Sequence, residues 1–142
     1  MYDVERGRCL VLRAECRLRS GDTHSANRDL EAARQDLEAE SAMKLAAGVH
    51  SALARWWSVK ARLLAGQGDW SEAAQAWTKA VAGRRHVAEL PQVMGAYTQN
   101  ALAETLWAQG QALLSAGCPR EAEESLTESQ AIRERIGLPH LL

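Results

Sequence analysis

The sequence predicts an all-α protein, and its composition and its prolines both favour that class. Ala and Leu, two strong helix formers, supply 26 and 18 of the 142 residues, whereas Val, Ile and Thr together supply only 14. The prolines, Pro91, Pro119 and Pro139, fall between segments of helical apolar spacing and never within one. A chain of this length buries enough surface to form a core without a disulfide or a metal.

Apolar residues that recur every three or four positions predict six helices. They cover about residues 4–19, 23–40, 46–67, 70–88, 91–116 and 119–136. In the first helix we expect two adjacent apolar stripes, one of Cys9, Leu12 and Cys16 and one of Leu10, Ala14 and Leu18. Cys9 and Cys16 lie seven residues apart, so they are expected to face the same packed neighbour as small buried hydrophobes.

The later helices each carry a face that we expect to be buried. These faces are Ala26, Leu30, Ala33 and Leu37 in the second helix, Leu53, Trp57, Ala61 and Leu64 in the third, and Ala73, Trp77, Ala80 and Val81 in the fourth. Trp57 and Trp77 are expected in the core, Trp70 at a corner, and Trp56 between repeats or on a self-association surface. Pro91 suits the first turn of the fifth helix.

Three glycine corners bring other residues into register and indicate an internal repeat. Gly21, Gly68 and Gly117 lie 47 and 49 residues apart. A small residue precedes each glycine by seven positions, and Ala follows it by five: Ala14, Ala61 and Gly110 before, Ala26, Ala73 and Ala122 after. The pattern predicts three helical hairpins, at about residues 4–40, 46–88 and 91–136. Stacking these hairpins would bury the apolar face that each one leaves exposed.

This pattern resembles the tetratricopeptide repeat (TPR), with the best match over residues 61–80. There the segment from Gly68 to Ala80, GDWSEAAQAWTKA, fits that family's corner and second helix. The resemblance implies a right-handed α-α superhelix. The spacing exceeds the usual period of about 34 residues, as in the long TPR-like arrays of large bacterial signalling proteins. The sequence also departs from the family where a large apolar residue is usual, at Arg13, Lys60 and Gln109.

In the TPR family the first helices of successive hairpins line a concave groove. The corresponding positions here are Arg8, Val11, Glu15 and Arg19, then Arg55, Ser58 and Arg62, and then Glu104, Trp107 and Gln111. From these we take as candidate partner-binding residues Arg8, Glu15, Arg55, Ser58, Arg62, Glu104, Trp107 and Gln111. Arginine forks would hold carboxylates, and Trp107 would be a flat anchor. Charge reversal at Arg55 and Arg62 is expected to weaken partner capture and leave the melting temperature nearly unchanged.

No pattern of residues indicates catalysis, so we expect no enzyme, cofactor or metal. The chain has no G-x-S-x-G, H-E-x-x-H or P-loop motif, and its four histidines lack partners at i, i+4. Three cysteines without C-x-x-C spacing predict reduced thiols. The net charge of −1 and the lack of a long apolar run argue against nucleic acid and membrane partners. A cytoplasmic location is the expectation.

The residues therefore favour a protein-interaction module that recognises a peptide or protein partner through its groove. The alternative is a sensory segment of a larger bacterial regulator, which binds a small ligand or peptide and passes a change of superhelical curvature to an attached domain. Residues 138–142, LPHLL, resemble the start of a further helix. We accordingly interpret the chain as part of a longer array, or as one whose end packs on a second copy as a homodimer.

Overall fold

The computed structural model describes residues 3–42, 47–90 and 95–137. Within them it contains six helices: α1 (Val4–Arg19), α2 (Thr23–Ala42), α3 (Ala47–Gly66), α4 (Trp70–Ala88), α5 (Ala96–Ser115) and α6 (Pro119–Arg135). No strand occurs in this part of the chain, which confirms the all-α prediction. The expected helix start at Pro91 and the expected further helix at residues 138–142 lie outside the described residues.

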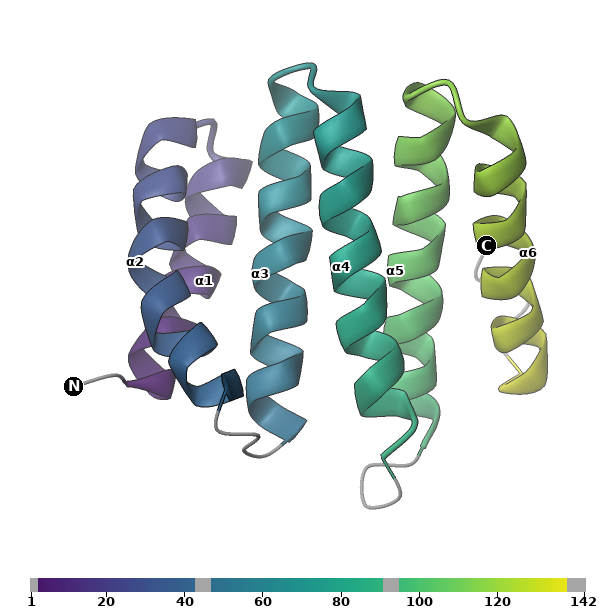
Figure 1. Ribbon diagram of the computed structural model, residues 1–142, viewed down its shortest axis with the longest axis horizontal. Coiled ribbons are helices and arrows are strands. Elements are labelled where there is room, and N and C mark those ends of the chain that lie inside the picture. The colour runs from purple at the N-terminus through teal and green to yellow at the C-terminus, as the bar shows by residue number, and fades with distance from the viewer. Residues whose placement is uncertain (1–2, 43–46, 91–94, 138–142) are drawn as a thin grey trace.

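Consecutive helices pack side by side, so the pairs α1–α2, α3–α4 and α5–α6 stand in chain order along the long axis of the molecule (Figure 1). Helix α4 packs against both α3 and α5, and α3 also contacts α1 and α2. None of the helices formed by the described residues is long and apolar enough to cross a membrane.

The three corners between paired helices are built in the same way. Their glycines have positive φ angles, +89° at Gly21, +82° at Gly68 and +83° at Gly117. The residue after each glycine donates its N–H to the carbonyl five residues earlier: Asp22 to Arg17, Asp69 to Leu64 and Cys118 to Leu113, at 2.8, 3.0 and 2.8 Å. This is the Schellman ending, in which glycine adopts the left-handed conformation at no steric cost.

Small residues lie where paired helices approach each other most closely. Ala14, Ala26, Ala61, Ala73 and Ala122 have no exposed surface. At the sixth equivalent position, a Cβ on Gly110 would lie 2.7 Å from Cγ and Cδ2 of Leu126. The approach of α5 to α6 therefore depends on a missing side chain at this position.

The expected buried faces of α2 and α4 are confirmed, whereas those of α1 and α3 are confirmed only in part. All four predicted residues of α2 are fully buried, and those of α4 are at most 7% exposed. On α1, in contrast, Cys9 and Cys16 are exposed and Leu12 is 47% exposed. The helix instead buries Gly7, Val11, Ala14 and Glu15. The stripe of Cys9, Leu12 and Cys16 is exposed because α1 stands at the end of the stack, where its main contacts are with α2 and α3.

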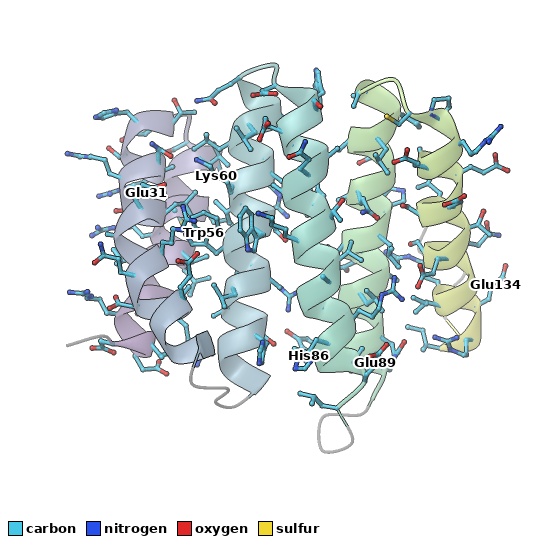
Figure 2. The ribbon with its side chains drawn as sticks, in the orientation of Figure 1. Glu31, Trp56, Lys60, His86, Glu89 and Glu134 are labelled. Atoms are coloured by element: carbon cyan, nitrogen blue, oxygen red, sulfur yellow. The ribbon has the colours of Figure 1, made fainter. Side chains whose placement is uncertain are left out.

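Helix α3 joins the first two hairpins through side chains that face α2 (Figure 2). Trp56 is 2% exposed, and its indole N–H donates to the carbonyl of Leu30 at 2.7 Å. Trp56 therefore lies between repeats, one of the two places expected for it. Trp77 is buried as expected, whereas Trp57 is only partly buried and lies edge-on to Trp56.

The polar residues at the positions where the TPR pattern usually has large apolar ones all bind second helices. Arg13 forms two hydrogen bonds with Asp29, at 3.0 and 2.8 Å. Lys60 donates to Asn27 of the preceding hairpin at 3.2 Å. Gln109 accepts from Ser125 at 2.8 Å and donates to Thr78 of the preceding hairpin at 3.1 Å. These three residues thus form hydrogen bonds within and between the hairpins.

Candidate functional site

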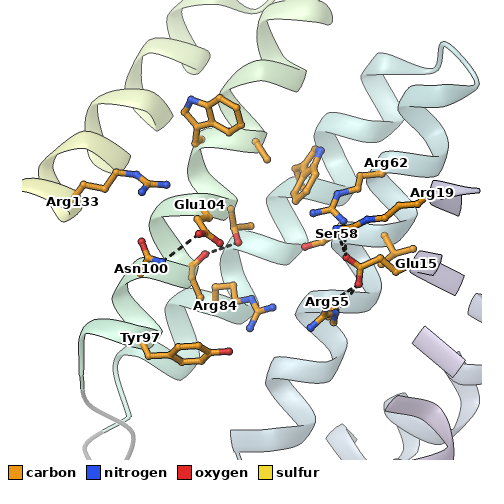
Figure 3. A pocket seen from close by; sticks show the side chains of 16 residues that line it. Glu15, Arg19, Arg55, Ser58, Arg62, Arg84, Tyr97, Asn100, Glu104 and Arg133 are labelled. Atoms are coloured by element: carbon orange, nitrogen blue, oxygen red, sulfur yellow. Dashed lines mark hydrogen bonds and ion pairs between the residues drawn. The ribbon is translucent and has the colours of Figure 1, made fainter. Parts of the chain in front are cut away.

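A groove lies between α3 and α5, with α4 packed against both helices beneath it (Figure 3). Its volume is about 660 Å³, and residues of α1, α3, α4, α5 and α6 line it. The charged lining residues are Glu15, Arg19, Arg55, Arg62, Arg84, Glu104 and Arg133, and the aromatic ones are Trp77, Tyr97 and Trp107. We call this cavity the α3–α5 groove.

Six of the eight candidate partner-binding residues line the α3–α5 groove: Glu15, Arg55, Ser58, Arg62, Glu104 and Trp107. Arg8 does not, because it lies two helical turns before Glu15 and binds the exposed Glu5 at 3.2 Å. Gln111 lies one turn beyond Trp107, past the end of the groove, and is exposed. Of the two further positions named by the resemblance, Arg19 lines the groove and Val11 is buried.

Glu15 gathers three arginines at the α1 end of the groove. The residue Glu15 is 9% exposed. Its carboxylate accepts hydrogen bonds from Arg55 at 3.0 and 2.8 Å, from Arg62 at 3.1 Å and from Arg19 at 3.3 Å. Burial by itself raises the pKa of Glu15, but the hydrogen bonds and charges of Arg55 and Arg62 outweigh burial and leave this pKa below its ordinary value. The carboxylate therefore stays ionised and links α1 to α3.

This network changes one expectation drawn from the sequence. Charge reversal at Arg55 and Arg62 was expected to leave the melting temperature nearly unchanged. Both guanidinium groups hold the buried Glu15, so reversing them would place three carboxylates together across the α1–α3 contact. A loss of stability is the physical consequence.

Arg84 enters the groove from α4 and has no partner there. Within the described part of the chain its guanidinium has neither a hydrogen bond nor an ion pair, and its Nε is inaccessible to solvent. Burial lowers the pKa of Arg84 and the nearby charge of Arg55 lowers it further, while Tyr97 and Glu104 act in the opposite direction. The group is nonetheless a cation, because arginine is not deprotonated in proteins.

Arg133 enters the same groove from α6 and is still more buried, at 7% exposure. It too lacks a hydrogen bond or ion pair with any described residue. Between these two arginines in the view of Figure 3 lies Asn100, whose Nδ2 donates to Glu104 at 3.3 Å and whose Oδ1 is buried without a donor. All three buried side-chain atoms that lack a partner in residues 3–42, 47–90 and 95–137 thus belong to groove residues.

The groove carries an excess of positive charge that the composition conceals. Its five arginines and two glutamates leave three positive charges, in a chain whose net charge is −1. A concave surface with one sign of charge attracts ligands of the opposite sign.

Sequence reasoning missed Arg84 and Arg133 because it followed the first helix of each hairpin. It missed Tyr97 and Asn100, which lie on the first helix α5, because the positions taken from the TPR resemblance did not include them. A signal was nevertheless present: Arg84 and Arg133 lie 49 residues apart, the spacing of Gly68 and Gly117. They are therefore equivalent positions of the second and third repeats.

In the described part of the chain, no group of three or more His, Cys, Asp or Glu residues is placed to hold a metal ion. Comparisons with protein-family models, with curated proteins and with solved structures find no match for this chain.

Proposed function

We propose that this chain is a protein-interaction module, a TPR-like right-handed helical scaffold that binds a segment of a partner in the α3–α5 groove. The observation that carries the proposal is that six candidate residues from three helices line one cavity. The corner built three times with the same hydrogen bonds supports a repeat architecture. Binding would rest on surface complementarity, without a covalent step.

The exposure of the lining residues supports a peptide as the ligand. Trp107 is 45% exposed and Tyr97 is 85% exposed, so both offer flat faces to solvent. Trp, Tyr and Arg are the residues that contribute most to binding energy at protein interfaces. An extended segment could contact these side chains in succession along α5.

A small-molecule sensor is the second candidate. The groove volume of about 660 Å³ lies within the range of small-ligand pockets, roughly 300–1,000 Å³. Such pockets bury most of their ligand. The exposed aromatic side chains on α5 favour an elongated ligand instead.

Selection from a displayed library of random peptides tests the proposal. The folded chain is expected to enrich a set of related sequences whose binding falls at least about tenfold in the Trp107→Ala variant, because an aromatic anchor is lost. Trp70→Ala is the matched control, since Trp70 is 40% exposed and lies outside the groove. If no sequences are enriched, or if both variants bind them equally well, the α3–α5 groove is not a peptide site.

A further inference from the structure

We propose that the segment bound in the α3–α5 groove is acidic, with Arg84 and Arg133 each holding one carboxylate and Asn100 accepting a main-chain N–H between them. This inference rests on the proposed function and identifies the class of partner. It uses residues of α4, α5 and α6, whereas the TPR resemblance pointed to first helices alone.

The first step is that two cations in the groove lack a counter-ion. Arg133 is more than nine-tenths buried and, among the described residues, has no hydrogen bond or ion pair. Arg84 has none either, and its Nε is inaccessible. A buried charge without a partner is costly, and buried polar groups are otherwise almost always paired. Anionic groups from outside the chain, one for each guanidinium group, would satisfy both arginines.

The second step is that the other arginines of the groove are already engaged. Arg19, Arg55 and Arg62 share the carboxylate of Glu15 at 2.8 to 3.3 Å. Glu15 therefore occupies the α1 end of the groove, as a ligand carboxylate would. The unsatisfied positive charge lies at the α4 to α6 end.

The third step is that the two unpaired arginines repeat with the fold. They are equivalent residues of neighbouring hairpins, and adjacent helix axes lie about 8–10 Å apart. Two such steps separate equivalent points by on the order of 10–20 Å, which roughly three to six extended residues would span. Two carboxylates at such a spacing in one peptide would match arginines that are anchored this far apart.

The fourth step concerns the atom between them. Oδ1 of Asn100 is buried and receives no hydrogen bond, while its Nδ2 is used by Glu104. An extended peptide presents main-chain N–H donors along its length, and one of them would satisfy this oxygen. Carboxylates and N–H groups in one strand thus match the three unpaired atoms of the groove.

Two capped peptides of about ten residues test the charge requirement. In the first, Glu alternates with Ser; in the second, Gln replaces every Glu, and acetylated and amidated ends remove terminal charges. The acidic peptide is expected to bind at least about tenfold more tightly by fluorescence anisotropy and to raise the melting temperature of the protein. Its affinity should fall as salt is added. Inorganic phosphate that raises the melting temperature equally at the same concentration would show a site for one small anion and overturn the proposal.

Substitution of the two arginines separates a binding role from a structural one. Arg84→Met and Arg133→Met should each weaken binding of the acidic peptide about tenfold or more and leave the melting temperature unchanged or higher, because an unpaired buried cation is removed. Arg28→Met is the control, since Arg28 is exposed on α2 and outside the groove. A lower melting temperature with unchanged peptide binding would assign Arg84 and Arg133 a structural role and contradict the proposal.

These outcomes remain distinct from those of the peptide selection. If selected peptides bind through Trp107 but contain no excess of acidic residues, and the Gln peptide binds as well as the Glu peptide, the groove binds peptides and the acidic specificity is wrong. If no peptide of either kind binds, the proposed function itself fails.

Discussion

Trp56 donates its indole N–H to the carbonyl oxygen of Leu30 at 2.7 Å, and both residues are buried. The donor belongs to the second hairpin and the acceptor to the first, so this hydrogen bond joins two units of the stack. The carbonyl of Leu30 would be left buried without this donor if the indole were removed.

Trp56→Phe should therefore reduce the free energy of unfolding by about 1–3 kcal/mol, because a buried hydrogen bond is lost and the smaller ring leaves space in the core. Urea denaturation at neutral pH measures this loss. Trp70→Phe, at an exposed corner, should change the same quantity by less than about 0.5 kcal/mol. Equal effects of the two substitutions would contradict the role given to Trp56.

Gly110 should not tolerate even a methyl group. A Cβ there would lie 2.7 Å from the Leu126 side chain and 3.4 Å from the carbonyl oxygen of Ala122, both on α6. We expect Gly110→Ala to cost about 1–3 kcal/mol of stability despite the better helix propensity of Ala. Gly66→Ala is the matched control, because no atom lies within 4 Å of the added Cβ. That variant should be neutral or slightly stabilising in the same denaturation experiment.

Acid should weaken the first hairpin before the rest of the stack. The carboxylate of Asp36 is fully buried and accepts from Arg6 and from the main-chain N–H of Asp3, each at 2.9 Å. The hydrogen bond from Arg6 lowers the pKa of Asp36 below its ordinary value by more than burial raises it. The pKa of Asp29 is lowered in the same way, chiefly by Arg13.

These pKa values are lower in the folded state than in the unfolded chain, so the two ionised carboxylates stabilise the fold. Their contribution to the free energy of unfolding is complete above about pH 5 and is lost as the pH falls through about 4 and below. Denaturation at pH 7, 5 and 3 measures the change. Asp36→Asn should cost about 1–3 kcal/mol at pH 7 and should make the loss between pH 5 and pH 3 smaller. A pH dependence that is unchanged in this variant would exclude Asp36 as a source of the acid sensitivity.

The cysteines of α1 should react faster with thiol reagents than the cysteine before α6. Cys9 and Cys16 are exposed, whereas Cys118 is half-buried against the core between the second and third hairpins. Under native conditions a thiol reagent such as Ellman's should modify two cysteines quickly and the third more slowly. The slow phase should vanish in Cys118→Ser and in denaturant. Two slow cysteines, with a slow phase that persists in Cys118→Ser, would instead support the buried stripe of Cys9 and Cys16 expected from the sequence.

Double charge reversal at Arg55 and Arg62 should now lower stability, contrary to the expectation from sequence. The two arginine side chains are each about half exposed, but both bind Glu15, whose side chain is 12% exposed. We expect the free energy of unfolding to fall by about 1–3 kcal/mol, measured by denaturation at neutral pH. The single variant Arg8→Glu, whose partner Glu5 is fully on the surface, should change it by less than about 0.5 kcal/mol.

The helices and corners of this protein could be predicted because they depend on local rules. Glycine is needed where φ is positive, as at Gly21, Gly68 and Gly117, and helical periodicity shows which residues share a face. The face of α2 with Leu30 and Leu37 could be identified in this way, and so could six residues of the groove.

Only the tertiary structure decided what covers each face. Periodicity could not show that the Cys9 and Cys16 stripe would be left exposed, because α1 has neighbours on one flank alone. Nor could it show that three arginines would gather on Glu15 while Arg84 and Arg133 find no partner among the residues that the structure describes. The periodicity of an α-helix fixes the direction in which each side chain points around the helix axis. Which partner that side chain meets depends on how separate helices pack.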